Sequence, residues 1–224
     1  KAESQQLFLD FLGEPKESER RKTPGIYDSV TLGPKGKRVQ FILLDTRYFR
    51  SPLKRSPKRE KGKGPYGPND SDKADLLGEA QWKWLEESLR QPADLRIIAS
   101  SIQVVSTTHG WETWGNFPTE RERLLTLLGK AKAKGILVLS GDRHSAEISK
   151  LDGVLSSPLF DVTSSAMNQK QRPQAEENPN RVGERYFEEN FGLLKINWSK
   201  PKPVVTMEIR NLGGKVVQAA QVTF

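Results

Sequence analysis

The stretch Val138–Glu147, VLSGDRHSAE, runs from an apolar strand directly into a turn that carries Asp142, Arg143 and His144. The chain of 224 residues contains only 2 histidines, and one of them stands here, two positions after an aspartate. Imidazole and carboxylate groups are common ligands of Zn, Mn and Fe, and Gly141 permits a tight turn. The spacing leaves two interpretations open: a metal-binding turn, or a turn in which Asp142 caps the backbone and His144 hydrogen-bonds to it.

The apolar stretches around this turn predict a layered α/β fold. Arg38–Thr46, Leu95–Ile102 and Ile136–Ser140 read as strands, whereas Leu77–Leu89 and Pro118–Lys130 have the periodicity of amphipathic helices. The order strand, helix, strand, helix, strand is typical of such a fold. The continuous apolar centre of the strand at 38–46 predicts that both of its faces are buried.

The two ends of the chain show other patterns. Ser4–Gly13 reads as a short helix and Gly25–Gly33 as a strand. After position 145 the pattern changes to short strands, which are typical of a meander or a sheet edge. These strands are Ala146–Leu151, Leu159–Ser164, Phe191–Trp198, Val204–Ile209 and Val216–Phe224.

Polar residues follow each central strand of the predicted sheet. Ligands of layered α/β proteins bind at the carboxyl ends of the strands, so these residues are candidates for a site. Asp45 and Arg47 follow the first strand, where we expect an ion pair that fixes the strand end, and Gln103 follows the second. Arg143 follows the third, where its guanidinium could hold a phosphate oxygen or could simply lie at the surface.

The segment HGWETWGNFP, residues 109–118, gathers three aromatic side chains in one loop. We expect Trp111, Trp114 and Phe117 to pack over the core rather than to line a pocket. Asn116 is most simply part of the start of the following helix. His109 is expected at the surface.

The chain is basic, with a formal net charge of +8, which favours anionic partners. Part of the excess lies in the run Lys54–Lys63, KRSPKREKGK, within a long polar loop at about residues 48–75. We interpret this loop as solvated, because nucleic-acid patches usually interleave aromatic residues or lie on a regular element. The alternative is a non-catalytic basic module that binds nucleic acid or another polyanion.

The chain contains no cysteine, which excludes disulfides and thiolate metal ligands. No apolar run approaches the ~20 residues that span a bilayer, and no signal peptide is visible. Metal ligands supplied by this chain would therefore be oxygen and nitrogen atoms.

Six longer segments together resemble the PhoD-like alkaline phosphatases, within the calcineurin-like metallophosphatase superfamily. The resemblance covers nearly the whole chain, in the order VQFILLDTRYFRSPL, LGEAQWKWLEESLRQPADLRIIASSIQVV, GWETWGNFPTERERLL, VLSGDRHSAEIS, FDVTSSAMN and ENFGLLKINW. It implies a four-layered αββα sandwich. Residues 1–224 would be the C-terminal part of a single metallophosphatase domain.

The resemblance also implies a two-metal centre that hydrolyses phosphate mono- and diesters. Its last metal motif, G-D-x-H, ends on His144, which is expected to be a metal ligand, with Asp142 a second ligand or its close support. These two residues would be catalytic, and Arg143, Arg47 and Gln103 would contact the phosphate-ester substrate. The ions would be two divalent or trivalent metals, with Fe, Ca, Zn, Mn and Mg all open.

The sequence departs from the family pattern at its start. Family members begin with motifs of the kind G-D-x-x-Y and W-D-D-H, and this sequence contains neither. One aspartate and one histidine are too few to hold two ions ~3.5–4 Å apart. We therefore expect an N-terminal half of the same protein to carry the remaining ligands. The resemblance further implies export to the periplasm or the extracellular space. A relative that has lost those ligands and acts as a structural or regulatory subunit is a further alternative.

Overall fold

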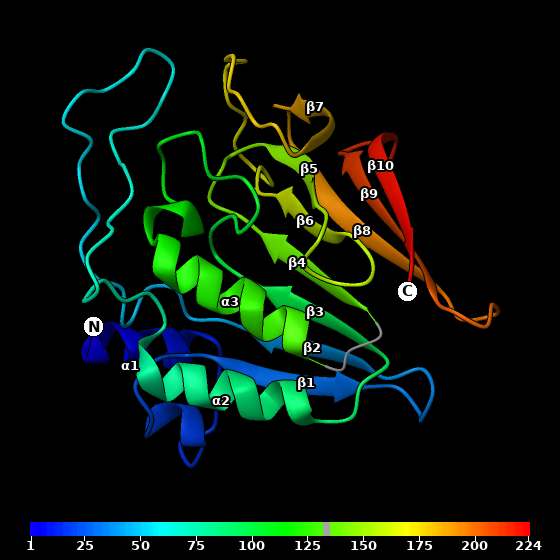
Figure 1. Cartoon of the computed structure of the whole chain (residues 1–224). Coiled ribbons are helices and arrows are strands. Elements are labelled where there is room, and N and C mark those ends of the chain that lie inside the picture. Colours follow the sequence, from blue (N-terminus) through cyan, green and yellow to red (C-terminus); the bar gives the residue numbers. More distant parts are fainter. Residues whose placement is uncertain (132–134) are drawn as a thin grey trace.

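A computed structural model describes residues 1–131 and 135–224 of the chain (Figure 1). The helices are α1 (Ala2–Phe11), α2 (Gly78–Arg90) and α3 (Pro118–Lys130), with short 3₁₀ turns η1 (Glu19–Arg21) and η2 (Trp114–Asn116). The strands are β1 (Asp28–Leu32), β2 (Val39–Leu43), β3 (Leu95–Ala99), β4 (Ile136–Ser140), β5 (Ala146–Leu151), β6 (Leu159–Ser164), β7 (Arg181–Tyr186), β8 (Asn190–Asn197), β9 (Val204–Asn211) and β10 (Val216–Thr223).

Two sheets form the centre of the fold. Within the described residues, one sheet has seven strands in the order β1-β2-β3-β4-β6-β5-β7, and the other has three in the order β10-β9-β8. β2, β3, β4 and β6 run parallel to one another, whereas β1, β5 and β7 pair antiparallel. The carboxyl ends of the four parallel strands therefore meet at one edge of the large sheet.

The large sheet is covered by helices on one face and by the small sheet on the other (Figure 1). Adjacent residues of a strand point to opposite faces. Accordingly, Val138 packs in the cluster with α2 and α3, whereas its neighbour Leu137 packs in the cluster with β9 and β10. The helix–sheet–sheet order confirms the α/β class and supplies three of the layers expected of an αββα sandwich.

The expectation that β2 is buried on both faces is wrong. Gln40 and Ile42 are buried, but Val39 and Phe41 are only half-buried and Leu43 is exposed. The small sheet explains the difference, because its main contacts with the large sheet, among the described residues, are made to β5, β6 and β7. On the face of β2 that points away from the helices, Val39 packs against the cluster that includes β9 and β10, whereas Phe41 and Leu43 are not part of that cluster.

The later strands divide between the two sheets. β8, β9 and β10 form the expected antiparallel meander. β5 and β6 keep their predicted bounds but join the large sheet, where β6 pairs parallel with β4 and β5 pairs antiparallel with β6. β7, whose sequence RVGERY has a weak apolar pattern, was not expected. It pairs with β5 at the edge of the large sheet.

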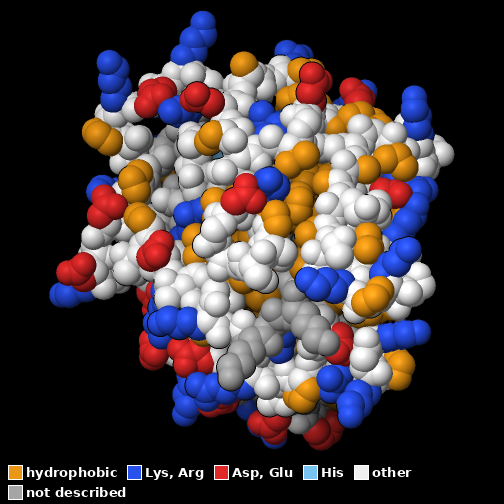
Figure 2. Space-filling view, turned by 45° about the vertical axis from the view of Figure 1, so that its right-hand side comes forward, with side chains coloured by type: hydrophobic (Ala, Val, Ile, Leu, Met, Phe, Trp, Pro, Cys, Tyr) orange, Lys and Arg blue, Asp and Glu red, His pale blue; other side chains and the backbone are white. Residues whose placement is uncertain are grey.

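The surface carries both signs of charge. Figure 2 shows Lys and Arg side chains spread around the outline of one face, mixed with Asp and Glu, while hydrophobic side chains gather in a central strip. The positive charge on this face is therefore not one continuous patch. None of the helices in the described part of the chain is long and apolar enough to cross a membrane.

Candidate active site

The site is built where the parallel strands end. Thr46, after β2, bonds through its hydroxyl to that of Ser101, after β3. The backbone N–H of Arg143, after β4, donates to Ser165 Oγ, after β6, at 3.0 Å. These contacts join the four strand ends in two neighbouring pairs, β2 with β3 and β4 with β6.

The turn after β4 has an unusual backbone. Asp142 and His144 have φ angles of 64° and 50°, and they are the two positive-φ residues other than glycine in the described chain. This left-handed conformation costs about 1 kcal/mol or more per residue, although Asp and His tolerate it better than most. Asp142 and His144 are exposed and Arg143 between them is buried. The turn therefore presents a carboxylate and an imidazole to solvent.

Asp142 lies beside Arg47, which comes from the end of β2. The Arg47 Nη2 and Asp142 Oδ2 atoms are 3.6 Å apart, and Arg47 Nη1 also contacts Glu112. The Asp142 side chain is still partly shielded from water by its neighbours; this desolvation raises the pKa of its carboxyl, and the positive charge of Arg47 offsets only part of that effect. The structure thus brings Asp142, His144 and Arg47 to one place, as expected from the sequence.

The expected ion pair between Asp45 and Arg47 is not formed. Among the acidic side chains of the described residues, Arg47 pairs with Glu112 and Asp142 instead. The Asp45 carboxylate accepts backbone N–H groups, from Arg47 and Tyr48 at 2.8 Å and from Ile26 at 3.0 Å. Asp45 therefore fixes the strand end through the backbone and leaves the guanidinium of Arg47 free to face the site.

Arg143 points into the protein. Its side chain is 6% exposed and pairs with the buried carboxylate of Glu176, whose Oε2 also lies 3.0 Å from Arg185 Nη1. Arg185 in turn donates to Ser145 Oγ at 2.8 Å. In this conformation Arg143 anchors the turn to the interior of the protein through Glu176. Contact between Arg143 and a phosphate stays a prediction that would require the pair with Glu176 to open.

Gln103 is fully buried rather than open to a ligand. Its amide donates to Glu147 Oε1 at 2.7 Å and to Thr163 Oγ1 at 2.8 Å. Burial favours the neutral form of Glu147, but the hydrogen bonds from Gln103 and Arg181 outweigh it and lower the pKa of that carboxyl. Gln103 therefore belongs to a polar network beneath the site, and its contact with substrate stays a prediction.

Asp161, on β6, holds the loop after β3 in place. Its Oδ2 accepts the backbone N–H groups of Val104 at 2.7 Å and Val105 at 2.9 Å, and its Oδ1 accepts Ser140 Oγ at 2.6 Å. Burial raises the pKa of this carboxyl despite those donors. One carboxylate thus links β6, β4 and the loop after β3, at the two residues that follow Gln103.

His109 is not at the surface as expected, because it is only 1% exposed. Its Nδ1 accepts the Trp111 backbone N–H at 3.0 Å, whereas no partner for its Nε2 occurs in the described part of the chain. Burial, together with the charges of Arg143 and Arg185, lowers the pKa of His109 to about 2. His109 is therefore a neutral interior residue.

The aromatic loop behaves largely as expected. Trp114 and Phe117 are buried in the core beneath the helices, and Trp111 is half-buried with Arg59 5.7 Å above its ring. Asn116 accepts the Thr113 backbone N–H at 2.8 Å. This bond is one half of a capping box that starts η2, just before α3.

The basic loop of residues 48–75 runs without a helix or strand apart from one bridge between Arg55 and Tyr66. The backbone N–H of Gly64 donates to His109 O at 2.8 Å, and that of Tyr66 donates to Gly110 O at 2.9 Å. These bonds fasten the loop to the segment that carries Trp111. Binding of nucleic acid or another polyanion by this loop stays a prediction.

Asp142 and His144 have the chemistry of one part of a metal site. They are exposed oxygen and nitrogen donors in one turn. Across residues 1–131 and 135–224, no group of three or more His, Cys, Asp or Glu side chains is arranged to hold an ion. The two donors fit a metal as a partial ligand set, which further ligands would complete.

Sequence reasoning missed four carboxylates that shape this region: Glu112, Glu147, Asp161 and Glu176. Glu147 and Asp161 carry a signal, because each is a lone acidic residue inside an apolar strand segment. Such a residue is buried only with partners. Glu112 and Glu176 lie in polar loops, where sequence pattern gives no comparable signal.

Fold and site together define a layered α/β protein with a polar site at the carboxyl edge of a parallel sheet. The family model described as PhoD-like phosphatase matches residues 1–195, and the chain belongs to that family.

Two known proteins illustrate the similarity. Alkaline phosphatase D of Bacillus subtilis (strain 168) is 26% identical over 125 residues, which are 52% of this chain and 21% of that protein. A solved structure, "Structure of PhoD", matches with a TM-score of 0.62 and 21% identity over 88% of this chain and 40% of that chain. The latter similarity confirms the fold. The chain therefore spans well under half the length of either relative.

Proposed function

We propose that this chain is the C-terminal part of a single metallophosphatase domain that hydrolyses phosphate esters with the help of metal ions. The observation that carries the proposal is the turn after β4, where Asp142 and His144 both adopt a left-handed backbone and both face solvent. Membership of the PhoD-like phosphatase family supports the reaction class. The remaining metal ligands would come from an N-terminal half of the same protein, and export would follow from the family.

Each residue has a role that follows from its position. Asp142 and His144 would hold one metal ion through a carboxylate oxygen and an imidazole nitrogen. Two bound ions would supply an activated water and charge neutralisation at the phosphoryl oxygens. Arg47 is 44% exposed beside Asp142, so its guanidinium can turn toward a phosphoryl oxygen and stabilise charge that develops during the reaction.

The residues beneath the turn would keep these groups in place. Arg143 and Glu176 hold the turn from the interior, and Asp161 fixes the end of β4 through Ser140. A site built on strand ends and supported by buried hydrogen bonds is held more firmly than one built on a free loop. The left-handed turn is therefore pre-organised for binding.

The test is turnover of p-nitrophenyl phosphate and bis(p-nitrophenyl) phosphate by the intact protein, with each of Fe, Ca, Zn, Mn and Mg. We expect Asp142→Asn and His144→Ala each to lower kcat by about 100-fold or more. Asp152→Asn is the matched control, because Asp152 is an exposed aspartate paired with Lys150 on another turn. Full turnover in both site variants would contradict the proposal.

A further inference from the structure

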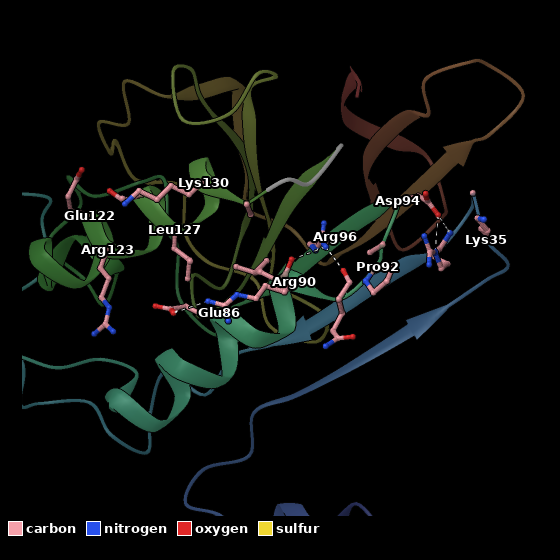
Figure 3. Close-up of a pocket in the computed structure, with 17 residues that line it drawn as sticks. Lys35, Glu86, Arg90, Pro92, Asp94, Arg96, Glu122, Arg123, Leu127 and Lys130 are labelled. Atoms are coloured by element: carbon pink, nitrogen blue, oxygen red, sulfur yellow. Dashed lines mark hydrogen bonds and ion pairs between the residues drawn. The ribbon is translucent and has the colours of Figure 1, made fainter.

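A cavity lies at the opposite end of the large sheet from Asp142. It has a volume of about 1120 Å³ and is lined at the amino ends of β2 and β3, including Arg38, Asp94 and Arg96. In Figure 3, Arg90 comes from the end of α2, Leu127 and Lys130 come from α3, and Arg96 lies between Arg90 and Asp94. The volume lies just above the range of about 300–1,000 Å³ that is usual for small-molecule sites.

Arg96 is a buried cation with one unused donor. The residue is 3% exposed; its Nε donates to Gln40 Oε1 at 2.9 Å, and its Nη2 donates to the carbonyls of Leu89 at 3.0 Å and Gln91 at 2.6 Å. Its Nη1 has no hydrogen-bond partner among the residues that the structure describes. A buried guanidinium N–H without a partner is costly, and an anion is its strongest acceptor.

The charge around Arg96 favours an anion. The cavity is lined by six Lys and Arg residues and three Asp and Glu residues. Asp94 accepts Arg38 N at 2.8 Å and Arg38 Nε at 3.3 Å, and Glu86 lies 4.0 Å from Arg90. Burial lowers the pKa of Arg96 although Asp94 acts in the opposite direction. The cavity therefore has an excess of positive charge.

Part of the wall is apolar. Leu89, Pro92 and Leu127 line the same space, and the exposed lysines Lys35 and Lys130 stand among its lining residues. A small inorganic anion would satisfy Arg96 but would leave this apolar wall in contact with water. A ligand that carries both an anionic group and an apolar chain would satisfy Arg96 and also cover the apolar residues of the wall.

We propose that this cavity binds an amphiphilic oxyanion, a carboxylate or phosphate that carries an apolar chain. The oxyanion accepts from Nη1 of Arg96 once the side chains that cover this buried atom move aside, and the chain packs on Leu89, Pro92 and Leu127. This site is separate from the turn after β4, and the proposal does not depend on phosphate-ester hydrolysis.

Isothermal titration calorimetry on the purified intact protein tests the site with four probes. Octanoate and octyl phosphate present the two head groups on the same chain, inorganic phosphate lacks the chain, and octanol lacks the charge. We expect octanoate, octyl phosphate or both to bind at least about 10-fold more tightly than inorganic phosphate and octanol. Preference between the two head groups identifies the oxyanion. Equal binding of octanol, or the absence of binding by both anionic probes, overturns the proposal.

Two variants locate the binding. Arg96→Gln removes the buried donor, and Leu127→Asp places a charge on the apolar wall, so each should weaken binding of the preferred probe by about 10-fold or more. Leu127→Asp keeps the test valid if Arg96→Gln does not fold. Lys58→Gln, in the basic loop, is the control that should bind as the parent protein does. Unchanged affinity in a folded Arg96→Gln or Leu127→Asp protein contradicts the assignment.

Discussion

Arg143 pairs with Glu176 inside the protein, although the neighbours of Arg143 on both sides, Asp142 and His144, face solvent. The Glu176 carboxylate lies in the segment between β6 and β7, far from the turn in sequence. Glu176 Oε2, the oxygen that contacts Arg143, also lies 3.0 Å from Nη1 of Arg185 on β7. The turn after β4 is thus held by the strand at the edge of the large sheet as well as by its own backbone.

Glu176→Gln should destabilise the protein by about 3 kcal/mol, because it leaves two buried guanidinium groups without their anion. Urea denaturation monitored by tryptophan fluorescence measures this change. Glu177→Gln is the matched control, since Glu177 is the exposed neighbour. Equal stability of the two variants would show that the buried pair does not anchor the turn.

Arg47→Met should raise KM for phosphate esters by about 10-fold, equivalent to about 1.4 kcal/mol, because the substrate's negative charge loses a cation beside Asp142. Arg47→Lys should recover part of the loss. Steady-state kinetics on the parent, Arg47→Met and Arg47→Lys proteins measure KM and kcat and test this prediction. A parent-like KM and kcat in Arg47→Met would remove Arg47 from the site.

His109 makes stability depend on pH. In the folded protein its pKa is lowered to about 2, whereas an unfolded histidine binds a proton below ~6.5. The unfolded state therefore binds more protons across that interval, so the free energy of unfolding falls as the pH falls below about 6.5. At pH 5 the loss from this residue is about 2 kcal/mol.

His109→Gln isolates that contribution, because glutamine keeps an acceptor for the Trp111 N–H and does not titrate. Urea denaturation at pH 7.5 and pH 5 should show a smaller difference for this variant than for the parent. The same pH dependence in both proteins would mean that His109 does not stay neutral in the folded state.

Gly64→Ala should loosen the basic loop. A Cβ at this position would collide with the carbonyl group of Gly110, which is backbone and cannot turn aside. We expect a loss of about 1–3 kcal/mol and faster proteolysis within residues 48–75. Gly213→Ala, at an exposed turn where the nearest side-chain atom is 3.5 Å away, is the control. Equal proteolysis of both variants would contradict the close approach of the two segments.

The sequence predicted the elements whose local pattern and tertiary role agree. α3, β4, β5 and β6 have the expected bounds because their apolar periodicity matches the face that they bury. The burial of β2 could not be predicted in the same way. It depends on how far the small sheet extends across the large one, and no residue of β2 encodes that distance.

In the candidate site, too, some features could be predicted from local sequence, whereas others depend on contacts between distant residues. Residue types and spacing placed Asp142 and His144 in a turn after a strand, and the resemblance to the phosphatase family favoured their interpretation as metal ligands. The direction of Arg143 could not, since it depends on Glu176, 33 residues later. The resemblance assigned Gln103 to substrate; in the structure its amide donates to Glu147 and Thr163 in the interior, and contact with substrate stays a prediction.

The most direct test of the central claim is the metal content of the intact protein, measured by elemental mass spectrometry. The account predicts about two metal ions per chain in the parent, and a clear loss in the double variant Asp142→Asn/His144→Ala, with Asp152→Asn unchanged. Undiminished metal content in the double variant would contradict the assignment of the turn after β4 as a metal-binding part of the site.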